Sequence, residues 1–344
     1  MISLHLTAFV ILTLLLLGCA AAPQSGAPTN AASSTLVRVE KVDGTFRLVR
    51  NGQPYFIRGV GGTQRLDDLV ALGGNSIRTW SSYQAEPVLD RAHKLNVSVT
   101  VGLWFKHPRH GYSYDDPAFV RKEIDTHLAD VRRLKHHPAI LMWAVGNEVE
   151  LGAQGDQTNM WRALNQAAKE IKQIDPSRPT ILIVAEIFDG KLAQILQHCP
   201  DIDILGINSY GSMDTSTARA RAQGWDRPIA VTEFGPRGWW EVAKTAWGAP
   251  IEPNSTDKAD TYFSRYFAAV NDNPLVIGSF AFLWGQKQEC THTWFGMFLP
   301  GAEGSRLGAA DAMSFAWTGR WPANRCPRIW DPRIDGPTDD LAPG

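Results

Sequence analysis

Short apolar runs alternate with amphipathic segments along the chain from about residue 47 onward. Several runs are apolar at almost every position, a pattern typical of strands that are covered on both faces. Between them, segments such as 119–137, 160–174 and 258–270 carry apolar residues at every third or fourth position, which predicts helices. The eight expected strands are residues 55–60, 75–80, 97–104, 139–146, 180–186, 203–210, 228–234 and 277–284.

This alternation of strands and helices predicts an α/β fold, a single (β/α)8 TIM barrel. A doubly wound open sheet is the structural alternative, but it rarely needs eight units, and no GxGxxG sequence follows the first expected strand. Because the composition does not shift within residues 47–320, we expect one barrel domain over residues 41–320. Prolines recur after Trp321, and we expect residues 321–344 to form an irregular tail.

The N-terminal residues indicate a processing segment rather than part of the fold. The apolar run from Leu6 to Leu17 is shorter than a membrane span and suits the hydrophobic part of a signal peptide. Its end, LLGC, resembles a bacterial lipobox, in which Cys19 would be lipidated; a plain secretory signal with an incidental cysteine is the alternative. Residues 1–19 are thus expected to be a lipoprotein-type signal segment, and residues 20–40 a flexible tether. We expect a lipid-anchored protein of the bacterial cell envelope, otherwise a secreted one, with the anchor as its only membrane contact.

Composition and charge exclude some partners. The formal net charge is -1 and the chain has no run of Lys and Arg, so we expect no nucleic-acid partner. No CxxC or Cys/His cluster is present, so we expect no metal and no cofactor. Besides Cys19 the chain has Cys199, Cys290 and Cys326, which allow at most one internal disulfide. The pair Cys290–Cys326 is favoured because both lie in the C-terminal loop region.

Polar side chains collect at the carboxyl ends of the expected strands. In a (β/α)8 barrel these ends meet at one face, where catalytic groups stand. The set contains Arg78 on the second strand, Asn147 and Glu148 after the fourth, Glu186 at the end of the fifth, Asn208 and Tyr210 on the sixth, Glu233 on the seventh and Trp284 on the eighth.

Two of the carboxylates suit one reaction. Glu148 and Glu233 follow the fourth and seventh strands, on opposed walls of the barrel mouth. Glycosidic bond cleavage needs one protonated and one ionised carboxyl group flanking the anomeric carbon. At a separation of roughly 5–5.5 Å the ionised group acts as a nucleophile and the anomeric configuration is retained.

Several sequence motifs extend this pattern into a family resemblance. The segments WAVGNEVE (143–150) and VTEFGP (231–236) resemble those of the clan A retaining glycoside hydrolases. The segments RLVRNGQPYFIRGVG (47–61), GGNSIRTWS (73–81), INSYG (207–211) and FLWGQKQ (282–288) resemble the TIM-barrel catalytic domain of glycoside hydrolase family 2. The resemblance covers most of residues 47–320. The layout and the NEV motif also resemble the fungal β-1,3-glucanosyltransferases.

The resemblance implies roles for particular residues. Glu148 would be the acid/base and Glu233 the nucleophile, while Asn147 would hydrogen-bond the sugar 2-hydroxyl. Arg78 would hold the nucleophile ionised. Tyr210 would hydrogen-bond the nucleophile, and Trp284 would form the floor under the reacting sugar.

Further residues complete the candidate set, and two of them, Glu186 and Trp240, have two interpretations each. Asn208 is expected beside Tyr210 as a substrate-binding residue. Glu186 would bind sugar hydroxyls or form a salt bridge at the rim. Trp240, in the long loop after the seventh strand, would be an aromatic platform for sugar or would pack the loop onto the barrel. His107 and His110 on the third loop lack the further ligands that a metal site needs.

The expected function is that of a retaining β-glycoside hydrolase acting on a β-linked oligo- or polysaccharide. A transglycosylase with the same residues, and a non-catalytic carbohydrate-binding lipoprotein, are the alternatives. The presence of both carboxylates with their expected supports favours an enzyme. The sequence determines neither the sugar, nor endo or exo action, nor the oligomeric state.

Overall fold

The computed structural model describes residues 35–188, 190–301 and 304–330. Cys19, the signal segment and most of the expected tether lie outside these residues. Among the described residues, no helix is both long enough and apolar enough to cross a bilayer.

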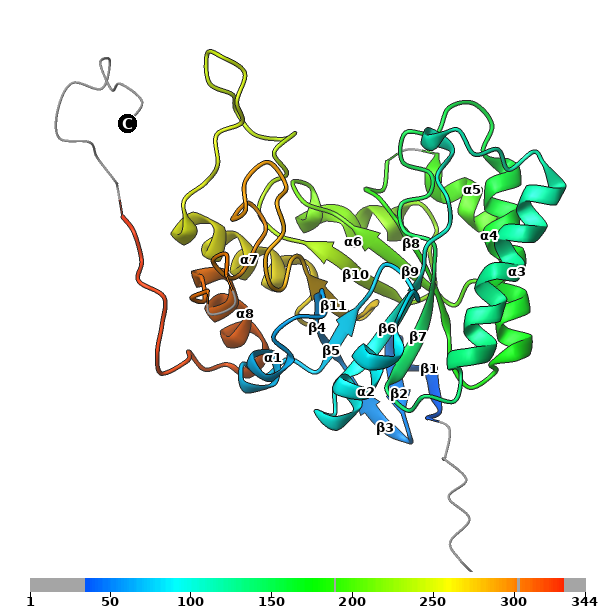
Figure 1. Ribbon diagram of the computed structural model, residues 1–344, viewed down its shortest axis with the longest axis horizontal. Coiled ribbons are helices and arrows are strands. Elements are labelled where there is room, and N and C mark those ends of the chain that lie inside the picture. Colours follow the sequence, from blue (N-terminus) through cyan, green and yellow to red (C-terminus); the bar gives the residue numbers. More distant parts are fainter. Residues whose placement is uncertain (1–34, 189, 302–303, 331–344) are drawn as a thin grey trace, which may run out of the picture. The chain divides into compact units, whose positions relative to one another are not determined.

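Eight parallel strands close into a barrel (Figure 1). They are β4 (Ile57–Gly61), β5 (Ser76–Arg78), β6 (Ser98–Leu103), β7 (Ile140–Val145), β8 (Thr180–Val184), β9 (Ile204–Asn208), β10 (Ile229–Phe234) and β11 (Val276–Ala281). Around the barrel they follow the order β10-β11-β4-β5-β6-β7-β8-β9. The predicted (β/α)8 barrel is therefore confirmed, and each expected strand matches an observed one with ends that differ by at most three residues.

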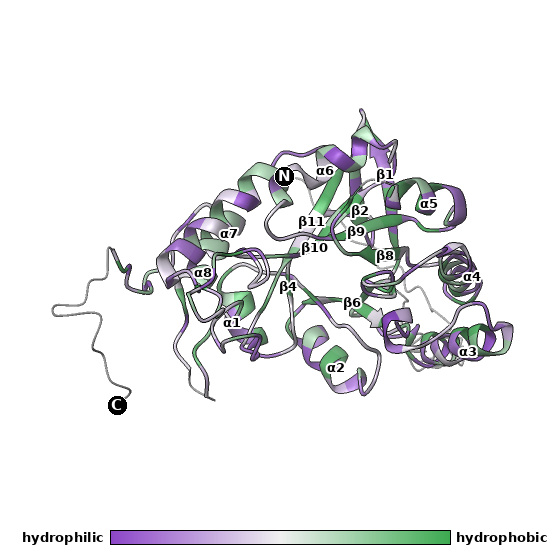
Figure 2. Ribbon diagram, turned by 90° about the horizontal axis from the view of Figure 1, so that it is seen from above, coloured by the Kyte–Doolittle hydropathy of each residue, from purple (hydrophilic) through white to green (hydrophobic). Residues whose placement is uncertain are grey.

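Helices surround the strands (Figure 2). They are α1 (Leu66–Ala71), α2 (Glu86–Lys94), α3 (Pro117–Leu134), α4 (Thr158–Ile174), α5 (Lys191–His198), α6 (Met213–Ala222), α7 (Ser255–Ala269) and α8 (Gly308–Thr318), with a 3-10 turn at Pro108–His110. Helix α3 begins where the sequence favours a helix start, because the Asp116 carboxylate accepts the Ala118 amide and Pro117 occupies the first turn. In Figure 2 the strands are mostly hydrophobic, whereas the helices carry both hydrophobic and hydrophilic stripes.

Alternate residues of most barrel strands belong to two different hydrophobic clusters. Along β9, Leu205 and Ile207 belong to the cluster shared with the helices, whereas Ile204 belongs to the cluster inside the barrel. Every residue of β6 is buried, so neither face of this strand meets water. Burial on both faces explains why these strands read as continuous apolar runs instead of alternating ones.

A small antiparallel sheet precedes the barrel. Its strands are β1 (Val37–Val42), β2 (Thr45–Arg50) and β3 (Gln53–Tyr55), paired in that order. The connecting pairs Asp43-Gly44 and Asn51-Gly52 all have positive φ angles, as tight hairpin turns require. Phe46 and Leu48 pack into the same cluster as the interior barrel residues, so this sheet covers the amino-terminal end of the barrel.

The start of this sheet corrects one expectation. Strand β1 begins at Val37, within the residues 20–40 that the sequence analysis assigned to a flexible tether. Val37 is 3% exposed, and its amide donates to the carbonyl of Ser177. The apolar side chain therefore fixes the chain against the barrel several residues earlier than composition suggests.

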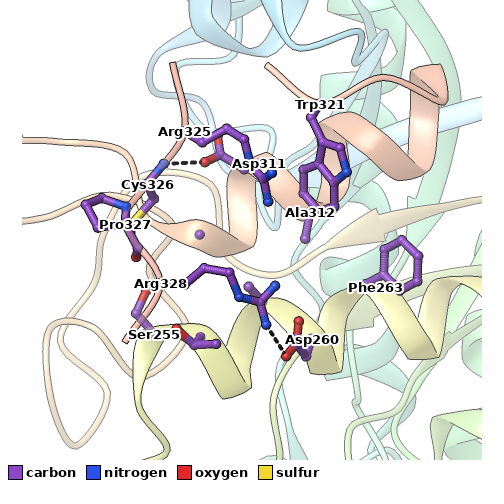
Figure 3. A pocket seen from close by; sticks show the side chains of 13 residues that line it. Ser255, Asp260, Phe263, Asp311, Ala312, Trp321, Arg325, Cys326, Pro327 and Arg328 are labelled. Carbon is purple, nitrogen blue, oxygen red and sulfur yellow. Dashed lines mark hydrogen bonds and ion pairs between the residues drawn. The ribbon is translucent and has the colours of Figure 1, made fainter. Parts of the chain in front are cut away.

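The last described segment, residues 319–330, runs as an irregular strap across α7 and α8 (Figure 3). Its Arg328 forms an ion pair with Asp260 on α7, and the amide of Cys326 donates to the buried carboxylate of Asp311 on α8. Figure 3 shows the small cavity that the strap and these helices enclose. The structure thus agrees with an irregular C-terminal segment up to residue 330.

The favoured disulfide is absent from the structure. Cys199, Cys290 and Cys326 are all free. Cys290 is exposed in the loop after β11, whereas Cys326 lies on the strap, held by the hydrogen bond of its amide to Asp311. Cys199 is buried beside α5, and burial raises the pKa of its thiol to about 12.

Candidate active site

Most of the predicted site residues meet at the carboxyl ends of the barrel strands. Arg78 ends β5, Asn208 ends β9 and Glu233 lies near the end of β10, while Asn147 and Glu148 follow β7 after one glycine. Hydrogen bonds connect all five of these side chains. Residues that are far apart in the sequence thus form one polar network.

Glu233 is surrounded by hydrogen-bond donors. Its Oε1 accepts from Arg78 Nη1 at 3.2 Å and from Trp80 Nε1 at 2.9 Å, and its Oε2 accepts from the Tyr210 hydroxyl at 2.7 Å. The residue is 6% exposed. Three donors on one buried carboxylate suit a negatively charged group.

An irregularity in β10 brings this carboxylate to the barrel mouth. Val231 pairs with Ile207 of β9, but the next paired residue is Glu233, opposite Asn208, so that Thr232 is the extra residue of a bulge. Bulges of this kind re-aim side chains next to active sites. Here both the Thr232 hydroxyl, which donates to Asn208 Oδ1 at 2.8 Å, and the Glu233 carboxylate reach the same network.

Arg78 is the buried cation of the network, with a side chain that is 0% exposed. Its Nη1 donates to Asn208 Oδ1 and to the Thr232 carbonyl as well as to Glu233, and its Nη2 donates to Asn147 Oδ1 at 2.6 Å. Burial lowers the pKa of Arg78, while the carboxylates of Glu233 and Glu148 raise it. Arginine stays charged in proteins, so a fixed positive charge lies beside Glu233.

Asn208 links the two carboxylates. Its Nδ2 donates to Glu148 Oε1 at 2.8 Å and to Asn147 Oδ1 at 3.2 Å, while its Oδ1 accepts from Arg78 Nη1 at 3.2 Å. The amide therefore fixes the position of Glu148 relative to the group that holds Glu233.

Glu148 lies in a different electrostatic environment. The chain leaves β7 through Gly146 with a φ of 76°, and Glu148 itself has a φ of 49°, a backbone region that a non-glycine residue rarely occupies. Its amide donates to the Ile183 carbonyl at 2.9 Å, which holds the turn against β8. Burial and then the negative charge of Glu233 raise the pKa of Glu148 to about 7. Glu148 can thus carry a proton at neutral pH, while Glu233 accepts hydrogen bonds from the cationic Arg78 and from the neutral Trp80 and Tyr210.

Sequence reasoning missed three residues here: Trp80, Thr232 and Phe282. Trp80 follows Arg78 by two residues, and that spacing places both side chains on one face of an extended chain. Phe282 contacts Trp80 and Tyr210, with ring centroids at 5.8 and 6.1 Å. The spacing from Arg78 was a usable signal for Trp80, but none was visible for the bulge at Thr232.

The structure does not bring Trp284 to the carboxylates, contrary to the expectation of a sugar floor. Its indole is 1% exposed, packs edge-on against Phe298 and donates to the carbonyl of Arg65 at 3.1 Å. An indole with both faces covered offers no surface to a sugar ring. Phe282 is the aromatic residue after β11 that contacts the site.

Glu186 lies outside the network. Its carboxylate forms an ion pair with Arg219 on α6 and accepts from the Ser209 hydroxyl. Of its two interpretations, the structure shows the salt bridge at the rim. A different carboxylate, Glu150, supports this wall of the barrel, where it accepts from the Ala185 amide and from Lys191 at 2.8 Å.

Trp240 lies beside Tyr210. Its side chain is 52% exposed, and it meets the tyrosine edge-on with 5.6 Å between ring centroids.

His107 and His110 stack on each other, with ring centroids 5.6 Å apart. Among the described residues, no group of three His, Cys, Asp or Glu side chains is placed to hold a metal ion.

Fold and site together define a class of protein: a (β/α)8 barrel with paired carboxylates after its fourth and seventh strands. Residues 88–236 match the family model described as glycosyl hydrolases family 2, TIM barrel domain. This part of the chain is therefore similar to the TIM-barrel domain of glycoside hydrolase family 2.

Individual proteins of known name are similar to the chain as well. The chain is 27% identical over 243 residues to a β-glucuronidase of Paenibacillus borealis, an alignment that covers 58% of this chain and 38% of the relative. It is 26% identical over 183 residues to a β-galactosidase of Vibrio cholerae, covering 45% of this chain and 16% of the relative. The fold of an Eisenbergiella tayi family 2 β-galacturonidase matches with a TM-score of 0.63 at 16% identity, over 86% of this chain and 55% of that one. The chain thus spans little more than half, or less, of the relatives it matches.

Proposed function

We propose that this protein hydrolyses β-glycosidic bonds of a carbohydrate substrate and retains the anomeric configuration. The observation that carries the proposal is the contrast between the two carboxylates. Glu233 accepts hydrogen bonds from three donors, and the pKa of Glu148 is raised to about 7 in the same network. Retaining glycosidases need such a pair, one group ionised and one protonated.

In the first step, the Glu233 carboxylate attacks the anomeric carbon. The bond between this carbon and the leaving oxygen breaks, and the oxygen takes the proton of Glu148. An ester between the sugar and Glu233 results. In the second step, water attacks the anomeric carbon, Glu148 accepts the water proton, and the ester bond breaks so that Glu233 is again a carboxylate.

The change of role by Glu148 follows from its surroundings. The negative charge of Glu233 is one cause of its raised pKa, and this charge disappears when the ester forms. The pKa of Glu148 then falls, so the group that donated a proton becomes able to accept one. Arg78 remains beside the ester and stabilises Glu233 as the charge returns.

Neutral donors complete the machinery. Trp80 and Tyr210 hold the attacking carboxylate in one orientation. Asn147 Oδ1 already accepts from Arg78 and Asn208, so its amide nitrogen is the group offered to a hydroxyl of the reacting sugar. A contact of this kind strengthens at the oxocarbenium-like transition state.

The test uses aryl β-glycosides and two variants, Glu233→Gln and Glu148→Ala. The panel includes the glucuronide, the galactoside and the mannoside, since matched relatives are named β-glucuronidase, β-galactosidase and β-mannosidase. It also includes the glucoside. Either variant should lower kcat by about 10³-fold or more. Glu186→Gln is the matched control, because this carboxylate belongs to the neighbouring wall and pairs with Arg219. Unchanged turnover in Glu233→Gln or Glu148→Ala would overturn the proposal, and a non-catalytic carbohydrate-binding protein would then explain the site.

Product analysis separates hydrolysis from transfer to a second sugar. Proton NMR of the first product should show the β-anomer if the configuration is retained. At high donor concentration, reducing sugars alone support a hydrolase, whereas longer oligosaccharides would support a transglycosylase that uses the same residues.

We also propose that Cys19 carries a lipid that anchors the protein in the bacterial cell envelope. The support is the LLGC sequence after the apolar run of the signal segment. Cells fed a labelled fatty acid should label the wild-type protein but not the Cys19→Ser variant. Equal labelling of both would contradict lipidation at Cys19, and an unlabelled wild-type protein would leave a plain secretory signal as the explanation.

A further inference from the structure

Exposed tryptophans lie at two places around the barrel mouth. Trp104, which is 39% exposed, directly follows the last residue of β6. Trp240, which is 52% exposed, lies in the loop that follows β10 and the attacking carboxylate. Both follow the carboxyl ends of their strands, the end at which Glu148 and Glu233 stand.

The strand order puts these two tryptophans on opposite sides. From β6 to β10 the closed barrel runs through β7, β8 and β9 in one direction, and through β5, β4 and β11 in the other. The two strands are therefore diametrically opposed. The strand spacing and tilt of an eight-stranded barrel give a diameter of roughly 15 Å between opposed strands. A single hexose ring does not span this distance, whereas a chain of linked sugars does.

Trp104 is held by a stack of flat rings. Its indole lies nearly parallel to the His107 imidazole, with centroids 5.1 Å apart and 27° between the planes, and His107 stacks in turn on His110. His107 is 1% exposed, and burial lowers its pKa to about 4, so the ring is neutral at neutral pH. A neutral, buried imidazole supports one face of Trp104 and leaves the exposed part of the indole at the surface.

Trp240 is fixed by the backbone of its own loop. Its ring lies so close to Gly238 that a Cβ at this glycine would come within 2.3 Å of the indole. Glu241 accepts the amides of Gly238 at 2.8 Å and Gly211 at 3.0 Å, which ties this loop to the start of the loop after β9. The edge-on contact with Tyr210 places Trp240 next to the residue that hydrogen-bonds Glu233.

Each tryptophan follows a strand that lies at or next to the strand of one catalytic carboxylate. Strand β6 neighbours β7, which Glu148 follows, whereas Trp240 follows β10, which carries Glu233. The two exposed indoles thus follow opposed strands of the barrel end at which the carboxylates stand. Flat apolar indole faces suit the faces of sugar rings, because their contact buries apolar area at little loss of side-chain entropy.

We propose that Trp104 and Trp240 bind sugar units on the two sides of the cleaved bond, so that the substrate is a β-linked sugar chain cut at internal linkages. This inference rests on the proposed function of the same site. It assigns Trp104 a substrate-binding role and defines the substrate by its length rather than by its terminal sugar.

The experiment uses β-1,3-, β-1,4- and β-1,6-linked gluco-oligosaccharides of two to six units, labelled at the reducing end. Internal cleavage should give products of intermediate length from the first time points. Release of single sugars only, one at a time from one end, would overturn the inference.

Variants test the two tryptophans separately. In Trp104→Ala and Trp240→Ala the loss of kcat/KM should grow with chain length, reaching about tenfold or more beyond the loss on an aryl monoglycoside. Trp104→Phe should recover part of the loss. The matched control is Trp247→Ala, because Trp247 lies in the same long loop as Trp240 but is 81% exposed. Equal losses on short and long substrates would contradict the inference.

The results of these experiments distinguish a failure of the chain-substrate inference from a failure of the proposed glycosidase function. If the wild-type protein hydrolyses aryl glycosides in a Glu233-dependent way but cuts none of the three oligosaccharide series internally, the inference fails and the proposed function stands. If Glu233→Gln is as active as the wild type on aryl glycosides, the proposed function fails, and the chain substrate with it.

Discussion

Arg78 and Glu233 form an ion pair from the second barrel strand to the seventh, with Nη1 3.2 Å from Oε1 and the guanidinium side chain 0% exposed. The same nitrogen contacts Asn208, which bonds Glu148. A single buried cation therefore contacts Glu233 directly and is linked to Glu148 through Asn208.

Arg78→Lys should lower kcat on an aryl β-glycoside by about 100-fold or more. A lysine ammonium cannot reproduce the fork that reaches Glu233, Asn208 and Asn147 together. Steady-state kinetics give the effect, and urea unfolding of the same variant separates lost chemistry from lost folding. A variant that folds and turns over like the wild type would contradict this role of the guanidinium.

Trp80→Phe removes one donor to Glu233 but keeps an aromatic ring at the contact with Phe282. We expect kcat to fall roughly tenfold to hundredfold, since one preorganised donor to a charged group is lost. The Tm should change little. A large drop in Tm with normal kcat would show that the indole serves packing alone.

The pH dependence of kcat/KM should have an alkaline limb near pH 7. Glu148 must be protonated to donate, and its pKa is raised to about 7 by burial and by Glu233, so activity is lost as pH rises through this value. On the same aryl β-glycoside, with a leaving group basic enough to need the proton, the residual activity of Glu148→Ala should lack this limb. If the limb stays at the same pH in Glu148→Ala, another group causes it.

The same pKa shift predicts a pH dependence of stability. Because the folded-state pKa of Glu148 is raised, the folded protein binds this proton more tightly than the unfolded chain. The stabilisation is complete below the unfolded-state pKa of about 4.3 and is lost as pH rises through about 7. Urea unfolding at several pH values should therefore show a smaller fall over this range in Glu148→Gln than in the wild type.

Glu186→Ala should affect stability more than catalysis. The carboxylate pairs with Arg219 and also accepts the Ile187 amide, and its loss should lower the free energy of unfolding by about 1–3 kcal/mol. The KM for aryl glycosides should stay within about twofold of the wild-type value. A large rise in KM would return Glu186 to the substrate-binding set.

Much of the fold was readable in the sequence because the barrel strands are buried on both faces. Continuous apolar runs such as those at 97–104 and 139–146 leave a strong signal, and polar residues directly after them can lie only at an open end of the barrel. The short sheet at 37–55 carries the turn pairs Asp43-Gly44 and Asn51-Gly52, a usable signal that the polar composition of the preceding residues obscured.

The sequence by itself determined the barrel, the pairing of Glu148 with Glu233 and the supporting positions of Arg78 and Tyr210, because strand ends converge whatever the loops do. Only the tertiary structure decided which aromatic side chains reach that centre. Trp80 and Phe282 do, and Trp284 does not. The bulge at Thr232 and the turn at Glu148 depend on contacts with neighbouring strands, which no local pattern in β10 or β7 records.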